Sequence, residues 1–236
     1  MILTHQSVSK HVLVGIALLG LMSACGGGGG GDSGGAAPTD PVCVAVTPPA
    51  PPAAGAALPQ VTFNFKNGLG VSGDVVITLE SARAPATVAN FLAYVNAGFY
   101  NCTVIHRHAP GFVLQGGGYA TALVPGAAFP TPKATRAPIA LEDKTGLSNL
   151  RLTVAMARTG VPDSATSEFF INLVDNTALD GTGLTRGYAV FGTITSGADV
   201  ITAMRSAPCS TWAGFTGPGE CLPSPNVTIM SAAQTR

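Results

Sequence analysis

The feature that most limits how this chain can fold is a series of short segments in which apolar and polar side chains alternate. Residues 61–65 and 75–80 follow this pattern, and Asn67-Gly68 between them is a turn signal. Because successive side chains of a β-strand point to opposite faces, each segment is predicted to be a half-buried strand. Further strands are expected at residues 103–105, 112–115, 152–157, 168–174, 189–195 and 227–231. Many short strands predict a mainly β fold built on a closed antiparallel sheet.

Two helices are predicted beside the strands. Pro85 opens the first, because its missing N–H costs nothing in the first turn, and Gly98 ends it. The apolar residues of this helix repeat at i, i+3, i+4 and i+7 and share one face: Val88, Phe91, Leu92 and Val95. The second helix, residues 199–204, is expected to bury Val200, Ile201 and Met204. Both helices are expected to cover the closed sheet.

Residues 1–24 have the pattern of an export signal rather than of a folded element. Their apolar run, residues 12–22, is shorter than a membrane span. Small residues then precede Cys25, which resembles the bacterial lipobox, whose cysteine is lipidated. Gly26 follows, where Asp would mark retention in the inner membrane. The resemblance implies a lipoprotein in a bacterial cell envelope, anchored through Cys25 alone, facing the periplasm at the outer membrane. The alternative is an ordinary secretory signal cleaved near Ala24.

Residues 25–60 are rich in Gly, Ala and Pro and carry almost no charge. Such a segment cannot bury enough apolar surface to offset the entropy lost on ordering. We therefore predict a disordered tether over residues 25–60 and one folded domain over residues 61–236.

The charge of the chain argues against one class of partner. Lys and Arg together number 12, as do Asp and Glu, and the basic residues form no run. Binding of nucleic acid needs clustered Lys and Arg, so no nucleic acid partner is expected.

Four cysteines remain besides Cys25, an even number that permits disulfides in an exported protein. Cys209 and Cys221 flank a Gly/Pro-rich loop and are the favoured pair. Cys43 and Cys102 then follow by elimination, and their bond would pin the end of the tether to the domain. Zinc binding by four thiolates is disfavoured because no two cysteines have the spacing of a zinc-binding pair.

Two segments, Tyr100–Gly118 and Ser164–Ile171, combine residues of distinct chemistry. They supply a cation (Arg107), an amide (Gln115) and three aromatic side chains: Phe112, Phe169 and Phe170. One arginine beside an apolar pocket suits an apolar substrate that carries a polar amide. The combination does not suit a phosphate or a metal.

These segments resemble the signature of the cyclophilin family of peptidyl-prolyl cis-trans isomerases, written F-H-R, P-G-F-x-x-Q-G-G and S-Q-F-F-I. Three further matches follow in order: Val154–Arg158, Leu179–Gly181 and Gly187–Gly192. The tyrosine of the last match, Tyr188, resembles the periplasmic bacterial branch. The resemblance covers residues 61–233 and implies a closed eight-stranded antiparallel β-barrel capped by two α-helices.

Prolyl isomerisation explains the need for an arginine. Resonance gives a peptide bond a rotational barrier of roughly 18–20 kcal/mol. Rotation returns a lone pair to the prolyl nitrogen, so a donor aimed at this atom binds the twisted amide better than the planar one. Arginine stays protonated and carries several N–H donors. The reaction needs no covalent intermediate, metal or cofactor.

The resemblance assigns roles to individual residues. Arg107 matches the catalytic arginine, Gln115 matches the glutamine that holds the substrate backbone and orients the arginine, and Phe112 completes the expected catalytic group. The other matched positions are expected to bind the proline-containing substrate: Val113, Ala157, Phe170, Leu179 and Tyr188. Taken alone, Arg107 would be read as a surface arginine and the aromatic residues as core side chains.

Three features of these segments have structural alternatives. Phe169 and Phe170 point to opposite faces, so Phe169 is assigned to the core and Phe170 to the pocket. His106 and His108 share a strand face and could chelate a metal, but without a third ligand nearby a structural role is favoured. The glycines at 116–118 lack the lysine and helix of a phosphate loop, which favours close backbone packing.

The chain departs from the family pattern at three positions. Glu168 stands where glutamine is usual and is expected to pair with Arg107, either orienting it or partly quenching it. Ala178 replaces an aromatic residue at the pocket rim, which implies weak cyclosporin binding. Leu152 replaces a glycine, a packing change without an evident reason in the sequence.

Residues 207–225 read as an elaborated loop, in which Trp212 and Phe215 either pack on the barrel or bind a partner. The leading hypothesis is a monomeric, cofactor-free prolyl isomerase that assists the folding of exported proteins. The alternative is a weakly catalytic binding module, chaperone or adaptor on the same fold, kept open by Glu168 and Ala178.

Overall fold

The computed structural model describes residues 40–51, 57–120, 123, 131–211, 215, 217 and 219–236. The predicted signal segment, the lipidation site Cys25 and Trp212 lie outside the described residues. Among those described, no helix has both the length and the apolarity needed to cross a bilayer.

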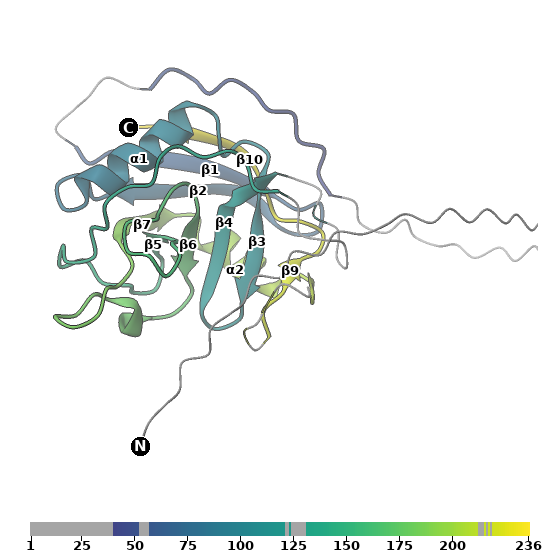
Figure 1. The fold of residues 1–236 in the computed structure, drawn as a ribbon. Coiled ribbons are helices and arrows are strands. Elements are labelled where there is room, and N and C mark those ends of the chain that lie inside the picture. Colours follow the sequence, from purple (N-terminus) through teal and green to yellow (C-terminus); the bar gives the residue numbers. More distant parts are fainter. Residues whose placement is uncertain are drawn as a thin grey trace, which may run out of the picture. The chain divides into compact units, whose positions relative to one another are not determined.

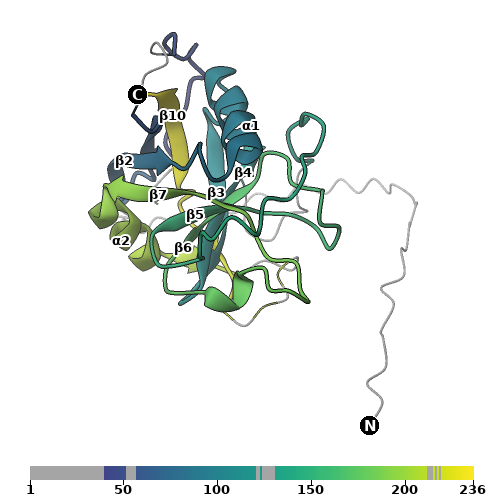
Figure 2. The same cartoon turned by 90° about the vertical axis from the view of Figure 1, so that its left-hand side faces the viewer.

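Eight of the described strands close into an antiparallel barrel in the order β1-β10-β3-β4-β6-β5-β7-β2 (Figure 1). They are β1 (Gln60–Lys66), β2 (Ser72–Leu79), β3 (Thr103–Ala109), β4 (Val113–Ala120), β5 (Thr153–Met156), β6 (Phe169–Asn172), β7 (Val190–Ser196) and β10 (Thr228–Gln234). Two helices, α1 (Pro85–Asn96) and α2 (Ala198–Ser206), lie on opposite sides of the barrel (Figure 2). The predicted fold class is confirmed.

Two barrel strands, β3 and β4, extend furthest beyond the ends that the sequence pattern indicated. β3 continues to Ala109, although residues 106–108 are His-Arg-His, because both histidines are buried. β4 continues through the three glycines to Ala120, where strand propensity is low. The glycines are needed there: a Cβ on Gly116 would meet Ile105, and one on Gly118 would meet Glu168. This favours the close-packing interpretation of residues 116–118.

Aromatic residues from separate elements fill the interior of the barrel. Phe63 lies 5.6 Å from Tyr100 and 5.6 Å from Phe169, measured between ring centroids. Phe91 brings α1 into this group, 5.3 Å from Tyr100. Each such pair adds about 0.5–1.5 kcal/mol beyond area burial. In α1, Tyr94 is buried in the core in place of the predicted Leu92, which is only half-buried.

A short second sheet, β8 (Cys209–Ser210) with β9 (Leu222–Pro223), was not predicted. Its two-residue strands are too short to show a period. A short 3₁₀ helix, η1 (Thr177–Leu179), was missed for the same reason.

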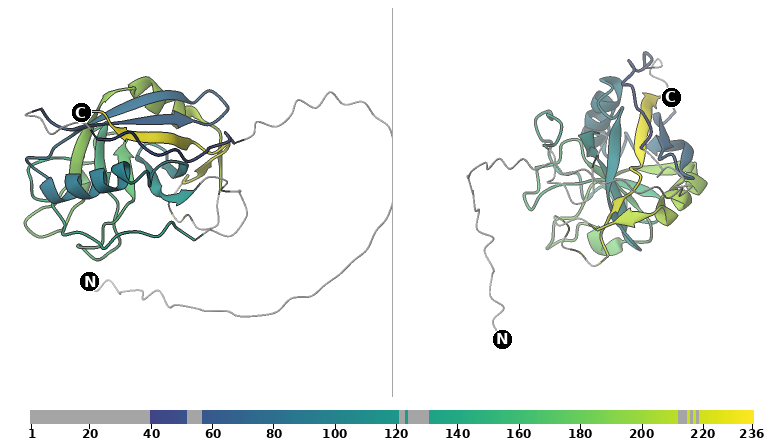
Figure 3. Two further views of the ribbon diagram at one scale, coloured as in Figure 1. Left: turned by 90° about the horizontal axis from the view of Figure 1, so that it is seen from above. Right: turned by 90° about the vertical axis from the view of Figure 1, so that its right-hand side faces the viewer.

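Residues 40–51 were predicted as part of a disordered tether over residues 25–60, and in the structure they are bonded to the compact unit that contains the barrel. Cys43 is bonded to Cys102, and the Nδ2 of Asn101 donates to the carbonyl oxygen of Val46 at 2.7 Å. The carboxylate of Asp40 accepts two hydrogen bonds from Asn226, each of 2.6 Å. Figure 3 shows the segment, in purple, running alongside β10. The specific bonds order a stretch that its composition alone would leave disordered.

Leu152 has a φ of 66°, in the left-handed region. A residue with a Cβ adopts this conformation at a cost of roughly 1–2 kcal/mol, which glycine avoids. The backbone therefore explains why the family pattern has glycine at this position.

Candidate active site

One row of cross-strand partners carries the central residues of the site. Arg107 on β3 pairs with Gln115 on β4, Gln115 pairs with Phe170 on β6, and Phe170 pairs with Ala155 on β5. Phe169, the neighbour of Phe170, is fully buried in the barrel core, so the alternating pattern places Phe170 on the opposite face of the sheet. The predicted division between Phe169 and Phe170 is confirmed.

A cavity of about 140 Å³ lies over this row. Its lining residues come from strands, from η1 and from connecting loops: Arg107, Phe112, Val113, Gln115, Ala157, Arg158, Phe170, Leu179 and Tyr188. The structure thus brings together every residue that the sequence predicted as catalytic or substrate-binding. Arg158 lies within the matched segment Val154–Arg158, but the resemblance assigned it no role. Below the cavity, Ala109, Val113, Ala155, Phe170 and Val190 form an apolar cluster separate from the barrel core.

A chain of hydrogen bonds runs from the cavity into the protein. The Nη1 of Arg107 donates to the Oε1 of Gln115 at 3.1 Å, and the Nε2 of Gln115 donates to the Oε2 of Glu168 at 2.8 Å. The same carboxylate oxygen lies 3.5 Å from the Nε2 of His106. Burial alone would raise the pKa of Glu168, but the hydrogen bonds from His106 and Gln115 and the His106 charge hold that pKa below its usual value. Glu168 is therefore ionised at neutral pH.

Arg107 does not pair with Glu168, which corrects the prediction from sequence. Its Nη2 donates instead to the Oε1 of Glu220, in the loop between Cys209 and Cys221. Glu168 sits one step further away, behind Gln115. Sequence reasoning missed Glu220 because no motif spacing connects it to Arg107.

The sequence of the barrel domain matches the model of a known protein family. The model described as cyclophilin type peptidyl-prolyl cis-trans isomerase/CLD covers residues 61–234. The chain belongs to this family. It is a cyclophilin-type peptidyl-prolyl cis-trans isomerase, and its substrates are proline-containing peptide segments.

Several bacterial relatives of this cyclophilin are more than 40% identical to it. The peptidyl-prolyl cis-trans isomerase of Acinetobacter baylyi is 42% identical over 74% of this chain and 86% of its own length. Peptidyl-prolyl cis-trans isomerase B of Escherichia coli is 43% identical over 73% of this chain and 97% of its own. Among solved structures, a cyclophilin type isomerase of Cryptosporidium parvum matches with a TM-score of 0.58 at 20% identity. It covers 76% of this chain and 98% of its own, and it shows the shared fold.

The far rim of the cyclophilin pocket is built around Tyr188. Its ring lies 5.5 Å from that of Phe170 in an edge-to-face arrangement, and the guanidinium of Arg158 lies 4.6 Å above it. The backbone N–H of Tyr188 donates to the carbonyl oxygen of Leu179 at 2.9 Å. Next to Leu179, Ala178 is exposed, so the rim lacks an aromatic side chain at that position.

Two carboxylates, the buried Asp143 and the half-buried Asp180, hold the loops that carry this rim. Asp143 binds the guanidinium of Arg186 through two hydrogen bonds of 3.1 Å and accepts the N–H of Gly187 at 2.7 Å. Asp180 accepts the N–H of Asn149 at 2.7 Å. For each, burial would raise the pKa, but the hydrogen bonds received, together with the Arg186 charge at Asp143, lower the pKa below its usual value. The resemblance assigned no role to either residue, although Asp180 lies within the matched segment Leu179–Gly181.

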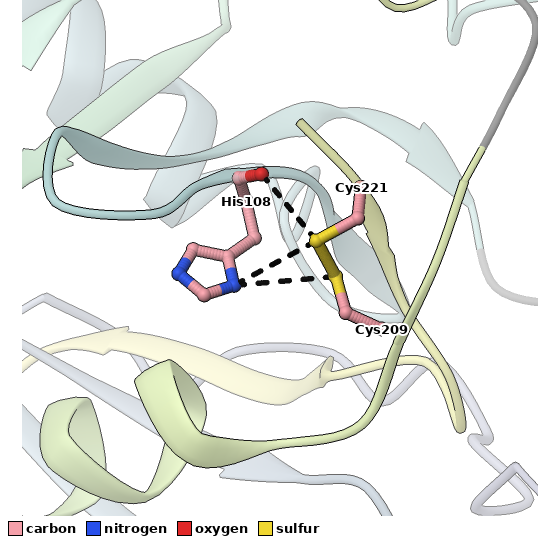
Figure 4. Close-up of side chains that lie close together, drawn as sticks. All are labelled: His108, Cys209 and Cys221. Atoms are coloured by element: carbon pink, nitrogen blue, oxygen red, sulfur yellow. Dashed lines mark hydrogen bonds between the residues drawn. A yellow bond between two sulfur atoms is a disulfide. The ribbon is translucent and has the colours of Figure 1, made fainter. Parts of the chain in front are cut away.

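The two histidines of β3 have different partners. His106 faces Glu168 and packs edge-on against Tyr119, whereas the Nδ1 of His108 lies 4.0 Å from the sulfur atoms of both Cys209 and Cys221 (Figure 4). Burial and the charge of Arg205 lower the pKa of His108. His108 with the two cysteines is the metal-capable group found among the described residues. The sulfurs are bonded to each other, so they do not act as thiolate ligands in this state.

The loop after α2 packs on the barrel through Phe215. This side chain is half-buried against a small apolar cluster made of Val104, Leu123 and Leu222. Of the two interpretations of the loop, its position favours packing over a partner-binding role for Phe215.

Proposed function

We propose that this isomerase works in a bacterial cell envelope, lipid-anchored through Cys25 at the outer membrane, and acts on exported proteins. The export pattern of residues 1–24 and the lipobox-like sequence before Cys25 support the proposal. Two disulfides, Cys43–Cys102 and Cys209–Cys221, add to it, because such bonds form and persist in oxidising compartments.

We further propose that Arg107 is the catalytic residue. The observation that carries this role is the guanidinium held by Gln115 at the edge of an apolar cavity lined by Phe112 and Phe170. A proline ring in the cavity brings the prolyl nitrogen within reach of the arginine N–H groups. These donors bind the nitrogen more strongly as its lone pair returns during rotation, which lowers the barrier.

The catalytic proposal is tested by measuring isomerisation of a short Ala-Pro peptide. Replacing Arg107 by Ala should lower kcat/KM by about 100-fold, the usual effect of removing one donor that acts in the transition state. Arg151→Ala, an exposed arginine outside the cavity, is the matched control and should keep full activity. Equal rates for the wild type and Arg107→Ala, with both proteins folded, would refute the role of Arg107 and favour a binding module on this fold.

The anchoring proposal is tested separately. A Cys25→Ser variant expressed in bacteria should lose incorporation of a labelled fatty acid and move from the membrane fraction to the soluble periplasmic fraction. Unchanged labelling would exclude Cys25 as the lipid site, and an unlabelled, soluble wild type would support an ordinary secretory signal.

A further inference from the structure

The loop between Cys209 and Cys221 is fastened to the strand that carries Arg107. The backbone N–H of Cys221 donates to the carbonyl oxygen of His108 at 2.9 Å, and the N–H of His108 donates to the carbonyl oxygen of Cys221 at 2.8 Å. The Cys209–Cys221 disulfide closes the loop at the same point (Figure 4). Arg107 and Glu220 each lie one residue from this antiparallel bridge. Their side chains therefore share one face as diagonal neighbours, a separation that two long side chains can span.

The loop also orients the carboxylate of Glu220. Its Oε1 accepts from the Nη2 of Arg107, while its Oε2 accepts the backbone N–H of Gly217 at 3.1 Å. The side chain of Glu220 is only 12% exposed and that of Arg107 22% exposed. An ion pair with this little exposure is screened less by solvent than a surface pair.

Arg107 is thereby held at both terminal nitrogens. Gln115 accepts from Nη1 and Glu220 accepts from Nη2. A free arginine side chain has about 2 kcal/mol of rotamer entropy to lose, and two acceptors, one at each terminal nitrogen, restrict that freedom before substrate binds. A guanidinium has about five N–H donors. Gln115 and Glu220 therefore orient Arg107 and leave its other N–H donors available to the substrate.

We propose that Glu220 is a positioning residue for prolyl isomerisation, which acts by fixing the guanidinium of Arg107 at the terminal nitrogen that Gln115 does not bind. The inference rests on the catalytic role proposed for Arg107. The loop closed by the disulfide then contributes to the reaction, because it carries Glu220, the second hydrogen-bond acceptor of Arg107. A one-ångström error in the placement of a catalytic group can cost about 100-fold in rate, so a lost orienting bond should be measurable.

The experiment compares kcat and KM for an Ala-Pro peptide in the full-length protein. Glu220→Ala should lower kcat/KM by about tenfold, mostly through kcat, because the orientation of Arg107 matters in the transition state. Glu220→Gln should stay within about threefold of the wild type, because its amide oxygen still accepts from Arg107. Glu80→Ala, which removes a carboxylate remote from the cavity, is the matched control.

A double variant separates positioning from a general structural effect. If Glu220 acts through Arg107, Glu220→Ala should cause no further loss in an Arg107→Ala background. A full additional loss there, or a Glu220→Ala variant as fast as the wild type, would overturn the inference. A faster Glu220→Ala variant would overturn it too, since Glu220 would then compete with substrate for Arg107. A normal rate for Arg107→Ala would instead refute the proposed catalytic role on which the inference rests.

Discussion

Glu168 determines which end of the Gln115 amide faces the cavity. An ionised carboxylate only accepts hydrogen bonds, so Gln115 must direct its NH₂ group toward Glu168 and its carbonyl oxygen toward Arg107. His106 holds the carboxylate from the other side. Glu168 thus acts on Arg107 indirectly, through Gln115, and does not quench the charge of Arg107 by direct contact.

This arrangement predicts different effects for two substitutions of Glu168. Glu168→Gln should change kcat/KM by less than about threefold, because an amide oxygen can accept the same hydrogen bond from Gln115. Glu168→Ala should lower kcat/KM by about tenfold, because Gln115 is then free to turn its amide away from Arg107. Steady-state kinetics on an Ala-Pro peptide measure both. A large gain for Glu168→Gln would instead favour direct quenching of Arg107.

At the level of elements, the pocket rim depends on the connection between η1 and β7, which has little secondary structure of its own. Asp143 binds Arg186 and Gly187 and so holds the loop in front of Tyr188. A Cβ on Gly187 would run into the backbone of Asp180 and Gly181. The Leu-Asp-Gly and Gly-Tyr-Ala motifs therefore pack backbone to backbone, which requires a glycine at 187.

Replacing Asp143 by Asn should reduce stability in a pH-dependent way. The folded pKa of Asp143 is lowered, so its stabilising contribution is complete above the unfolded value of about 3.9 and is lost as the pH falls toward the folded pKa. Asp143→Asn should lower the free energy of unfolding near neutral pH by about 2 kcal/mol. The difference from wild type should shrink below about pH 4.

Urea denaturation at several pH values measures this difference, with Asp199→Asn, an exposed residue in the first turn of α2, as the control. A difference between Asp143→Asn and wild type that stayed constant down to pH 3 would contradict the assignment of the lowered pKa to Asp143. Because the loop positions Tyr188, the KM for an Ala-Pro peptide should rise as well.

At the scale of the whole molecule, the two disulfides serve different parts of the protein. Cys43–Cys102 joins residues 59 apart and ties the N-terminal segment to the barrel. Cys209–Cys221 joins residues 12 apart and closes the loop that holds Glu220. In the chain-entropy treatment the longer loop contributes about 4 kcal/mol and the shorter about 3 kcal/mol.

Removing each bond should therefore separate stability from catalysis. Replacing Cys43 and Cys102 by Ser should lower the free energy of unfolding by up to about 4 kcal/mol and leave kcat/KM within twofold. Replacing Cys209 and Cys221 by Ser should cost less stability, about 3 kcal/mol, yet lower kcat/KM at least threefold. Thermal unfolding and peptide kinetics on the two double variants provide the comparison. The reverse order of catalytic effects would show that the loop does not position Arg107.

The sequence alone determined a closed antiparallel sheet from the alternation of its strands, and its resemblance to the cyclophilin signature implied the eight-stranded barrel and the residues around its pocket. Arg107, Gln115 and Phe170 could be identified because they lie in short motifs, and the alternation of a strand decides which face each side chain occupies. The helices could be located because an apolar stripe at helical spacing is a local property of the chain.

Only the tertiary structure decided which charged groups meet. Arg107 and Glu220 are 113 residues apart, and their contact depends on a loop that pairs with the end of β3. The register of β3 against β4 shifts between Ile105 and Arg107, an irregularity without a sequence period, and it changes which side chains become neighbours. The ordering of residues 40–51 likewise depends on partners far along the chain. Local sequence patterns indicate which face of an element a residue occupies. Ion pairs and strand ends depend instead on how segments far apart in the sequence pack together in the folded chain.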